Sequence, residues 1–346
     1  MRKKTLFVLM VVGLVASTYI VGWAAPTPLI KWKGQNGWNP GVALGPYEDS
    51  SGAALINLWV KWIEEVTDRR LVIELAPVGS IFPTTESFKA VSKGVVPIVG
   101  AWESWFTGAF PEGDIVAQLP MAYDYPEDVF AVYYKYGLYD LMQKAHAKHN
   151  IYWIPTMSSR LQSWNSKFAI NSPEDIKGKV FRAAGIGADI INMLGGKAVP
   201  IPYGEVYMAM KLGTIDGYSG GISMLEDVKL KEVVRYYVEE PTLYFSISSI
   251  LINMDAFNKL PADIRKIIDK QSRYIIADTT MYRFATEQYQ LSHTPEVQFV
   301  RWSKKDISRL RKMVIETIWP KLAGRSPVSK EAIDILIKFQ KDHGRY

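Results

Sequence analysis

The run from Gly217 to Gly221 reads Gly-Tyr-Ser-Gly-Gly and matches the G-x-S-x-G pattern of a nucleophile elbow, with Ser219 as the nucleophile. An elbow needs a strong hydrophobic strand before the serine and a helix after it, and a histidine and an acid later in the chain. Residues 211–216 instead predict a helix end and a very short strand. The only later histidines are His293 and His343. A secreted serine hydrolase using Ser219 is therefore kept only as the alternative function.

Two other patterns could indicate a binding site, but each is a less specific signal. His146 and His149 are three residues apart on a predicted helix, a spacing that can place two metal ligands on one face. Lysines surround them, which favours a solvated helix C-terminus, because cations suit that end of the helix dipole. The run 185–187 (Gly-Ile-Gly) lacks the third glycine of a dinucleotide-binding loop. We expect no metal site and no cofactor.

Arg182 ends a predicted strand that follows a short helix and a glycine turn. On that strand it shares a side with Val180 and Ala184. A guanidinium among small apolar residues is costly unless it is paired. From the residues alone, the partner of the Arg182 guanidinium could be either an internal carboxylate or a bound anion.

The elements that position these residues alternate between strand and helix. In the first half they are 29–34, 53–67, 71–76, 85–93, 95–101 and 128–148. In the second half they are 151–156, 173–177, 179–183, 186–194, 198–201, 205–211 and 242–253, followed by helical patterns over 261–291, 304–322 and 329–342. This rhythm predicts an α/β fold with a mainly parallel sheet and covering helices.

Composition excludes several classes of protein. The 346 residues suffice for two domains, and 48% hydrophobic with 22% charged residues excludes a disordered chain. The absence of cysteine excludes disulfides, cysteine-bound metals and thiol catalysis. Basic residues are scattered among acidic ones, so we expect no nucleic-acid partner.

The first 24 residues have the pattern of a cleaved signal peptide. Three basic residues at 2–4 precede an almost wholly apolar run over 6–21, and Gly22 and Ala24 occupy the small-residue positions before a cut after Ala24. A retained membrane anchor is the alternative. Three of the six net positive charges lie in this segment, so the mature chain is only slightly basic.

Several motifs in order resemble one known family. Residues 173–182 (Pro-Glu-Asp-Ile-Lys-Gly-Lys-Val-Phe-Arg) are similar to the P-x-D-L-K-G-x-K-x-R pattern of the extracytoplasmic solute-binding proteins of TRAP transporters, the DctP family. The likeness continues in 194–196 and 199–207, then in 208–217, which resembles A-L-x-x-G-x-v-D-G, and in the Leu-Pro at 260–261. The resemblance covers essentially the whole mature chain.

The resemblance implies a two-lobed, periplasmic-binding-protein-like fold. Each lobe would be a mixed, mainly parallel sheet with covering helices, joined by crossing strands at 151–157 and 242–253 and by a bridging helix over 261–291. The expected organisation is a signal peptide at 1–24, lobe I at 25–157 plus 249–288, and lobe II at 158–248 plus 289–346.

The resemblance also implies a receptor and no catalysis. Such a protein binds a small organic acid between its lobes in the periplasm and delivers it to the subunits of a TRAP membrane permease. A binding protein that feeds a sensor is the remaining possibility within this class.

By the same likeness, Arg182 would hold the ligand carboxylate through two parallel hydrogen bonds. Glu103, Asn36 and Gln162 also match positions that contact the ligand in this family. Sialic-acid binders carry a second arginine where this chain has Gln162, which argues against sialic acid as the ligand. The segment 218–221 departs from the family, because it lacks the carboxylate that holds a metal in keto-acid binders.

The glycines at 220 and 221 leave space for a bulkier ligand. Aromatic residues near the matched positions predict an aromatic or flat, apolar monocarboxylate. Together with Ser219, the aromatic contacts that we expect are Trp38, Trp102, Trp164 and Tyr218. Trp105 is a further neighbouring candidate.

Overall fold

One sheet of ten strands runs through the described part of the molecule, residues 29–40 and 52–346 of the computed structural model. The sheet order is β2-β1-β3-β9-β4-β7-β5-β6, with β8 paired to β4 and β10. The strands are β1 (Ile30–Gln35), β2 (Leu71–Ala76), β3 (Ile98–Ala101), β4 (Ile151–Ser166), β5 (Val180–Arg182), β6 (Lys197–Val199), β7 (Gly217–Gly221), β8 (Tyr236–Glu240), β9 (Tyr244–Asn253) and β10 (Gln298–Arg301).

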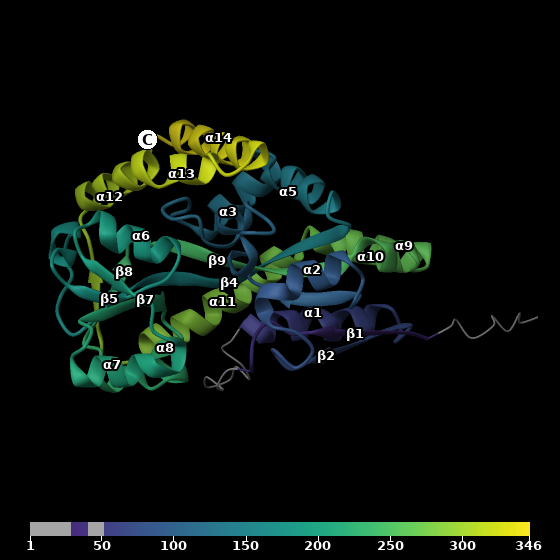
Figure 1. Ribbon diagram of the computed structural model, residues 1–346, viewed down its shortest axis with the longest axis horizontal. Helices are drawn as coiled ribbons and strands as arrows, with labels where there is room; N and C mark the ends of the chain where they lie inside the picture. The colour runs from purple at the N-terminus through teal and green to yellow at the C-terminus, as the bar shows by residue number, and fades with distance from the viewer. Residues whose placement is uncertain (1–28, 41–51) are drawn as a thin grey trace, which may run out of the picture.

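Helices lie on both sides of this sheet (Figure 1). The α-helices are α1 (Gly52–Val66), α2 (Ser87–Ser92), α3 (Gly113–Gln118), α4 (Pro126–Phe130), α5 (Leu138–Ala147), α6 (Ile186–Met193), α7 (Val206–Leu212), α8 (Met224–Asp227), α9 (Met254–Asn258), α10 (Ala262–Ser272), α11 (Ile275–Ser292), α12 (Lys304–Thr317), α13 (Trp319–Ala323) and α14 (Pro327–Asp342). Short 3₁₀ turns connect several of them, and one π-helical turn spans Ala131–Lys135.

The sheet divides into two parallel sections, which are the cores of two lobes. In lobe I, β1 pairs in parallel with β2 and β3. In lobe II, β5 pairs in parallel with β6 and β7. Helix α1 covers the lobe I section and buries Leu55, Ile56, Trp59 and Ile63 completely, because these residues recur on one helical face. The predicted two-lobed α/β fold is confirmed.

The antiparallel pair β4 and β9 joins the two sections. β4 pairs with β9 from Ile151 to Gln162 and with β7 from Gln162 to Ser166. β9 in turn pairs with β3 of lobe I. The register of β4 against β9 shifts on both sides of Ser159. Strand β4 is therefore much longer than the predicted strand at 151–156, because it serves both lobes.

Two of the predicted long helices are interrupted. The helical pattern over 128–148 becomes α4, a π-helical turn and α5, and Gly137 separates the last two with a left-handed φ of 91°. The pattern over 261–291 becomes α10 and α11, which meet at Arg273 and Tyr274. The helical spacing of apolar residues continues across both interruptions, so the sequence pattern did not reveal these breaks.

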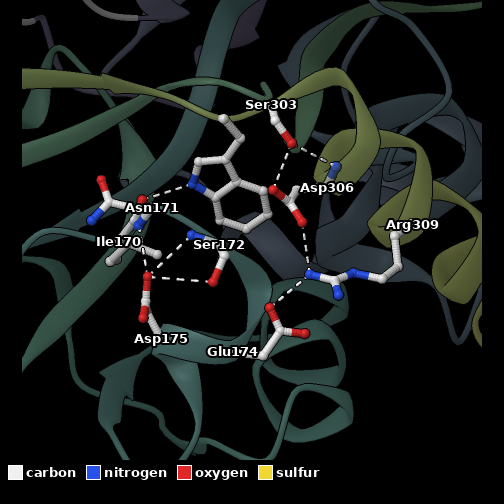
Figure 2. Close-up of polar contacts among 9 residues, drawn as sticks. Ile170, Asn171, Ser172, Glu174, Asp175, Ser303, Asp306 and Arg309 are labelled. Carbon is white, nitrogen blue, oxygen red and sulfur yellow. Dashed lines mark hydrogen bonds and ion pairs between the residues drawn. The ribbon is translucent and has the colours of Figure 1, made fainter.

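The family-like motif after Asn171 forms a capped 3₁₀ turn that anchors α12 (Figure 2). The Asp175 carboxylate accepts hydrogen bonds from the backbone N–H groups of Asn171 and Ser172 at the start of this turn. Arg309 of α12 pairs with Glu174 at 2.6 Å. Trp302, just before α12, donates its Nε1–H to the Ile170 carbonyl at 2.7 Å. Helix α12 is therefore fixed to lobe II.

The chain then returns to lobe I. Trp319 of α13 donates its Nε1–H to the Pro120 carbonyl at 3.0 Å, and Gln340 of α14 donates to the Ala122 carbonyl at 2.6 Å. The helices α12, α13 and α14 form a continuous cover along one side of the molecule (Figure 1). The apolar face of α14 packs on α5 and α3, which lie in the predicted lobe I. The boundary that assigns 289–346 to lobe II stays a prediction.

Within residues 29–40 and 52–346, none of the helices has the length and apolar character needed to cross a membrane. The predicted signal peptide at 1–24 lies outside the described residues.

The close packing of β1 on β3 predicts a large cost for any side chain at Gly34. A Cβ atom there would lie 2.1 Å from the Ile98 carbonyl oxygen, which belongs to the backbone and cannot rotate away. We expect Gly34→Ala to lower the free energy of unfolding by about 2 kcal/mol or more, measured by urea titration. Gly108→Ala is the matched control, because a Cβ atom at Gly108 meets nothing within 4 Å. Equal stability of the two variants would contradict the packing described.

Candidate functional site

A cavity of about 680 Å³ lies where the crossing strands meet both lobes. Lobe I contributes three tryptophans among other residues, lobe II contributes several polar residues, and β4 and β9 contribute hydroxyl groups. The aromatic, polar and charged lining residues include Trp38, Trp102, Trp105, Ser158, Ser159, Gln162, Arg182, Ser219, Asp227, Tyr244 and Ser246.

Arg182 reaches the cavity from the end of β5. Its Cα position is paired with Tyr218 of β7, and its Nε donates a hydrogen bond to the Ile201 carbonyl at 3.0 Å. This bond fixes the direction of the guanidinium group. Two terminal nitrogens of an arginine are suited to the two oxygens of a carboxylate.

Tyr244 of β9 and Ser219 of β7 lie beside Arg182. Burial raises the pKa of the Tyr244 phenol, while the Ser219 hydroxyl and the positive charge of Arg182 act in the opposite direction. The phenol is therefore neutral at physiological pH and keeps its proton. This corner of the cavity is positively charged and contains hydroxyl groups.

Three half-buried tryptophans form the lobe I wall of the cavity. The ring centroids of Trp38 and Trp105 are 5.0 Å apart, and Trp102 meets Trp105 edge to face at 6.2 Å. The Trp102 Nε1–H is bonded to the Ala117 carbonyl at 3.3 Å. The cluster therefore offers apolar ring surface to the cavity.

Five of the nine predicted contact residues line this cavity: Trp38, Trp102, Gln162, Arg182 and Ser219. The structure does not bring the other four to its wall.

Trp164 and Tyr218 are completely buried. Trp164 packs against Trp302 with ring centroids 5.5 Å apart, and Tyr218 belongs to the apolar core of lobe II. Asn36 lies just behind the wall, where its Oδ1 accepts a hydrogen bond from the Trp38 backbone N–H at 3.2 Å. Asn36 is placed to fix Trp38.

Glu103 is fully buried in the core of lobe I, away from the cavity lining. Its Oε1 accepts hydrogen bonds from Trp153 Nε1 at 2.7 Å and from the Ser249 hydroxyl, and its Oε2 lies 3.1 Å from His146 Nε2. His146 also donates its Nδ1–H to the Met142 carbonyl at 2.8 Å. The expectation of a solvated His146 was wrong, because the end of α5 turns inward against Phe110 and Trp153.

Sequence reasoning missed several lining residues. Ser158 and Ser159 follow directly after the predicted crossing strand, and Ser246 and Tyr244 lie inside the other one. The run of serines in two otherwise apolar strands was the available signal, because apolar strands that cross a dry core seldom carry consecutive serines. Asp227 follows β7 closely and gave no signal of its own.

Ser219 lacks the nucleophile-elbow geometry that the hydrolase alternative requires. Ser219 lies in the middle of β7, paired with Trp164 of β4, and not at a turn between a strand and a helix. The His293 ring stacks on Tyr289, and the His343 ring is bonded to the Phe339 carbonyl. Nothing in the described residues supports the serine hydrolase alternative.

The comparisons with known proteins agree with this architecture. Residues 44–323 match the family model DctP, described as bacterial extracellular solute-binding protein, family 7. A monocarboxylate 2-oxoacid-binding periplasmic protein of Nostoc sp. is 26% identical over 253 residues, 70% of this chain and 65% of that protein. The C4-dicarboxylate-binding periplasmic protein DctP of Rhodobacter capsulatus is 22% identical over 63% of this chain and 65% of its own length. The alignments thus cover slightly less than two thirds of these relatives.

Solved structures share the fold. A TRAP periplasmic solute-binding protein from Colwellia psychrerythraea, with bound calcium and pyruvate, superimposes with a TM-score of 0.74 at 22% identity, covering 91% of this chain and 95% of that one. One from Rhodoferax ferrireducens, with bound malonate, has a TM-score of 0.73 at 18% identity, covering 90% and 98%.

The buried position of Glu103 predicts an effect on stability. Glu103→Ala removes the acceptor of the Ser249 hydroxyl and the partner of His146 Nε2, and it leaves Trp153 Nε1 with only the Ser249 hydroxyl as acceptor. Such a loss costs about 3 kcal/mol. We expect a much lower urea midpoint, while the folded fraction keeps its ligand affinity. Glu86→Ala, at an exposed carboxylate 3.8 Å from Lys89, is the control and should leave both quantities unchanged. A large loss of affinity at unchanged stability would instead make Glu103 a ligand contact.

Proposed function

The chain belongs to the DctP family of bacterial extracellular solute-binding proteins, and from that membership we propose that it captures a small organic acid between its two lobes and delivers it to a TRAP-type permease. The proposed place of action is the periplasm. The proposed role is that of a receptor without catalytic activity.

The observation that carries this proposal is the position of Arg182. Its guanidinium group is held by the Ile201 carbonyl at the wall of the cavity between the lobes. A carboxylate that enters the cavity would pair with it, and closure of the lobes would remove water and strengthen the pair. The relatives named above are described as binding monocarboxylate 2-oxoacids and C4-dicarboxylates, and the solved neighbours hold pyruvate and malonate.

We propose capture without a metal ion, in contrast to the Colwellia structure with calcium. The segment of β7 at the cavity supplies Ser219, Gly220 and Gly221, none of which is a strong metal ligand. Among the residues that the structure describes, no group of three histidines and acids lies close enough together to hold a metal.

The tryptophan wall supports an aromatic or flat, apolar body for the ligand. Trp38, Trp102 and Trp105 line the same cavity as Arg182 and come from lobe I. A ligand with its carboxylate at Arg182 would place the rest of its surface against these rings.

Removal of Arg182 tests the proposed function. The loss of one partner from a buried, hydrogen-bonded charge pair costs about 2 kcal/mol or more, so we expect Arg182→Ala to weaken acid binding at least about 30-fold. Arg182→Lys should lose most of this affinity too, because an ammonium group cannot form two parallel bonds. The measurement is a thermal-shift screen of the processed protein against organic acids, followed by calorimetry on the hits.

Lys197→Ala is the matched control, since it removes an equal charge from an exposed position of the neighbouring strand β6. Wild-type protein that binds no acid, or an Arg182→Ala variant with unchanged affinity, would overturn the proposal.

The aromatic wall generates a separate prediction. We expect Trp102→Ala to weaken the binding of an aromatic acid about tenfold and to affect a short aliphatic acid much less, because only the former covers the ring. Trp62→Ala removes a half-buried tryptophan of lobe I outside the cavity and should leave both affinities unchanged. Equal losses for the two acids in Trp102→Ala would show that the wall does not select for aromatic ligands.

A further inference from the structure

Gly221, at the end of β7, lies against the side chain of Gln162, and both residues line the cavity. The two residues are partners in the antiparallel pairing of β7 with β4. A Cβ atom at Gly221 would lie 2.8 Å from Nε2, 3.4 Å from Cδ and 3.6 Å from Oε1 of Gln162, and apart from the chain neighbours no other atom comes nearer. The amide of Gln162 therefore lies directly over the Cα atom of Gly221.

The backbone of Gln162 is held from both sides. Gln162 is the last residue of β4 that pairs with β9, where it lies opposite Tyr244, and the first that pairs with β7. Its carbonyl accepts a hydrogen bond from the Leu243 backbone N–H at 2.8 Å. A glutamine side chain, in contrast, can change between several rotamers. The part of Gln162 that can move is therefore its amide end.

The neighbouring glycine lies against a different side chain. A Cβ atom at Gly220 would lie 2.6 Å from Sδ of Met224 and 3.2 Å from the ring of Tyr218. Successive residues of a strand point to opposite faces, so Gly220 and Gly221 have different neighbours. The sequence suggested that these two glycines leave space for a bulky ligand. In the structure, side chains of the protein itself take up the space beside each of them.

We propose that Gly221 is a positioning residue of the binding site, because its missing side chain sets the place of the Gln162 amide as a contact for the ligand. This inference rests on the proposed function. A side chain at position 221 displaces the amide, and since both residues line the cavity, the cavity is the space into which the amide can turn. The amide then fills volume that an acid paired with Arg182 would use, and its hydrogen-bonding groups no longer meet that acid.

The substitution Gly221→Ala tests this role without a large loss of stability. The short distance at Gly221 involves the mobile end of a side chain, whereas at Gly34 it involves a backbone carbonyl. The backbone of Gly221 does not have a left-handed φ, so alanine adopts it without strain. We therefore expect the urea midpoint of Gly221→Ala to stay close to that of the wild type.

The experiment measures binding to the wild type, to the two single variants and to the double variant by calorimetry. The probes are phenylpyruvate, mandelate and 4-hydroxyphenylacetate, which are aromatic acids with one carboxylate and one further polar group. For the acid that wild-type protein binds most tightly, we expect Gly221→Ala and Gln162→Ala each to weaken binding about tenfold. In the Gln162→Ala background, Gly221→Ala should change the affinity less than about twofold, because the amide that it displaces is gone.

Gly220→Ala is the matched control. It adds the same methyl group to the adjacent residue of β7, but it displaces Met224 and not Gln162. Whatever factor Gly220→Ala costs, we expect the same factor in the presence and in the absence of the Gln162 side chain. A coupling that is confined to Gly221 identifies Gln162 as the group through which this glycine acts.

The outcomes separate this inference from the proposed function. If Arg182→Ala abolishes binding, but Gly221→Ala costs the same factor in both backgrounds, the glycine contacts the ligand directly and the positioning inference is wrong. Wild-type affinity in Gly221→Ala or in Gln162→Ala would overturn it as well, and the receptor function would stand in each case. If wild-type protein binds none of the three acids, the aromatic acid of the proposed function is contradicted, and the positioning inference with it.

Discussion

The antiparallel pairing of β4 with β9 is the interaction on which the rest of the structure depends. The parallel section of each lobe is hydrogen-bonded to one end of this pair, so the relative position of the lobes follows from its register. The register is regular from Ile151 to Met157 and shifts around Ser159. The cavity lies at this irregular part, where strand hydrogen bonding is least continuous. One segment thus both connects the lobes and lines the site.

The two lobes contribute different chemistry to the site. Lobe I supplies tryptophan rings that bury apolar surface, and lobe II supplies the charged and hydroxyl groups around Arg182. Neither wall is a complete binding site, because the rings lack a partner for a carboxylate and the polar wall lacks a surface for a hydrophobic body. A ligand with both parts gains its full contacts only when the lobes approach each other. This division links recognition to closure, because the second set of contacts forms only when the lobes are closed.

Much of the fold could be predicted from the sequence, because alternating apolar patterns and glycine turns are local signals. The strand that ends at Arg182 follows from such signals, and so does the capped turn at Ser172. The positions of single side chains depend on tertiary packing. Glu103 and Tyr218 have polar groups that suit a ligand, and both are buried in cores that form only when distant helices pack on the sheet. The serines beyond Met157 were a visible signal in the residue pattern, but the shift in strand register that accompanies them could not be predicted from it.

The helices after β10 have a mechanical consequence. The chain passes between the lobes in β4, β9 and α11, and it returns a last time between α12, tied to Glu174, and α13, tied to Pro120. Several separate connections between two lobes resist twisting and sliding of one lobe against the other. Bending about one axis is then the motion that costs the least energy. In a capture by closure, the free energy needed to bend the connection between α12 and α13 would subtract from the free energy of ligand binding. If the proposed capture proceeds by closure of the lobes, the stiffness of the connection between α12 and α13 would set part of the ligand affinity.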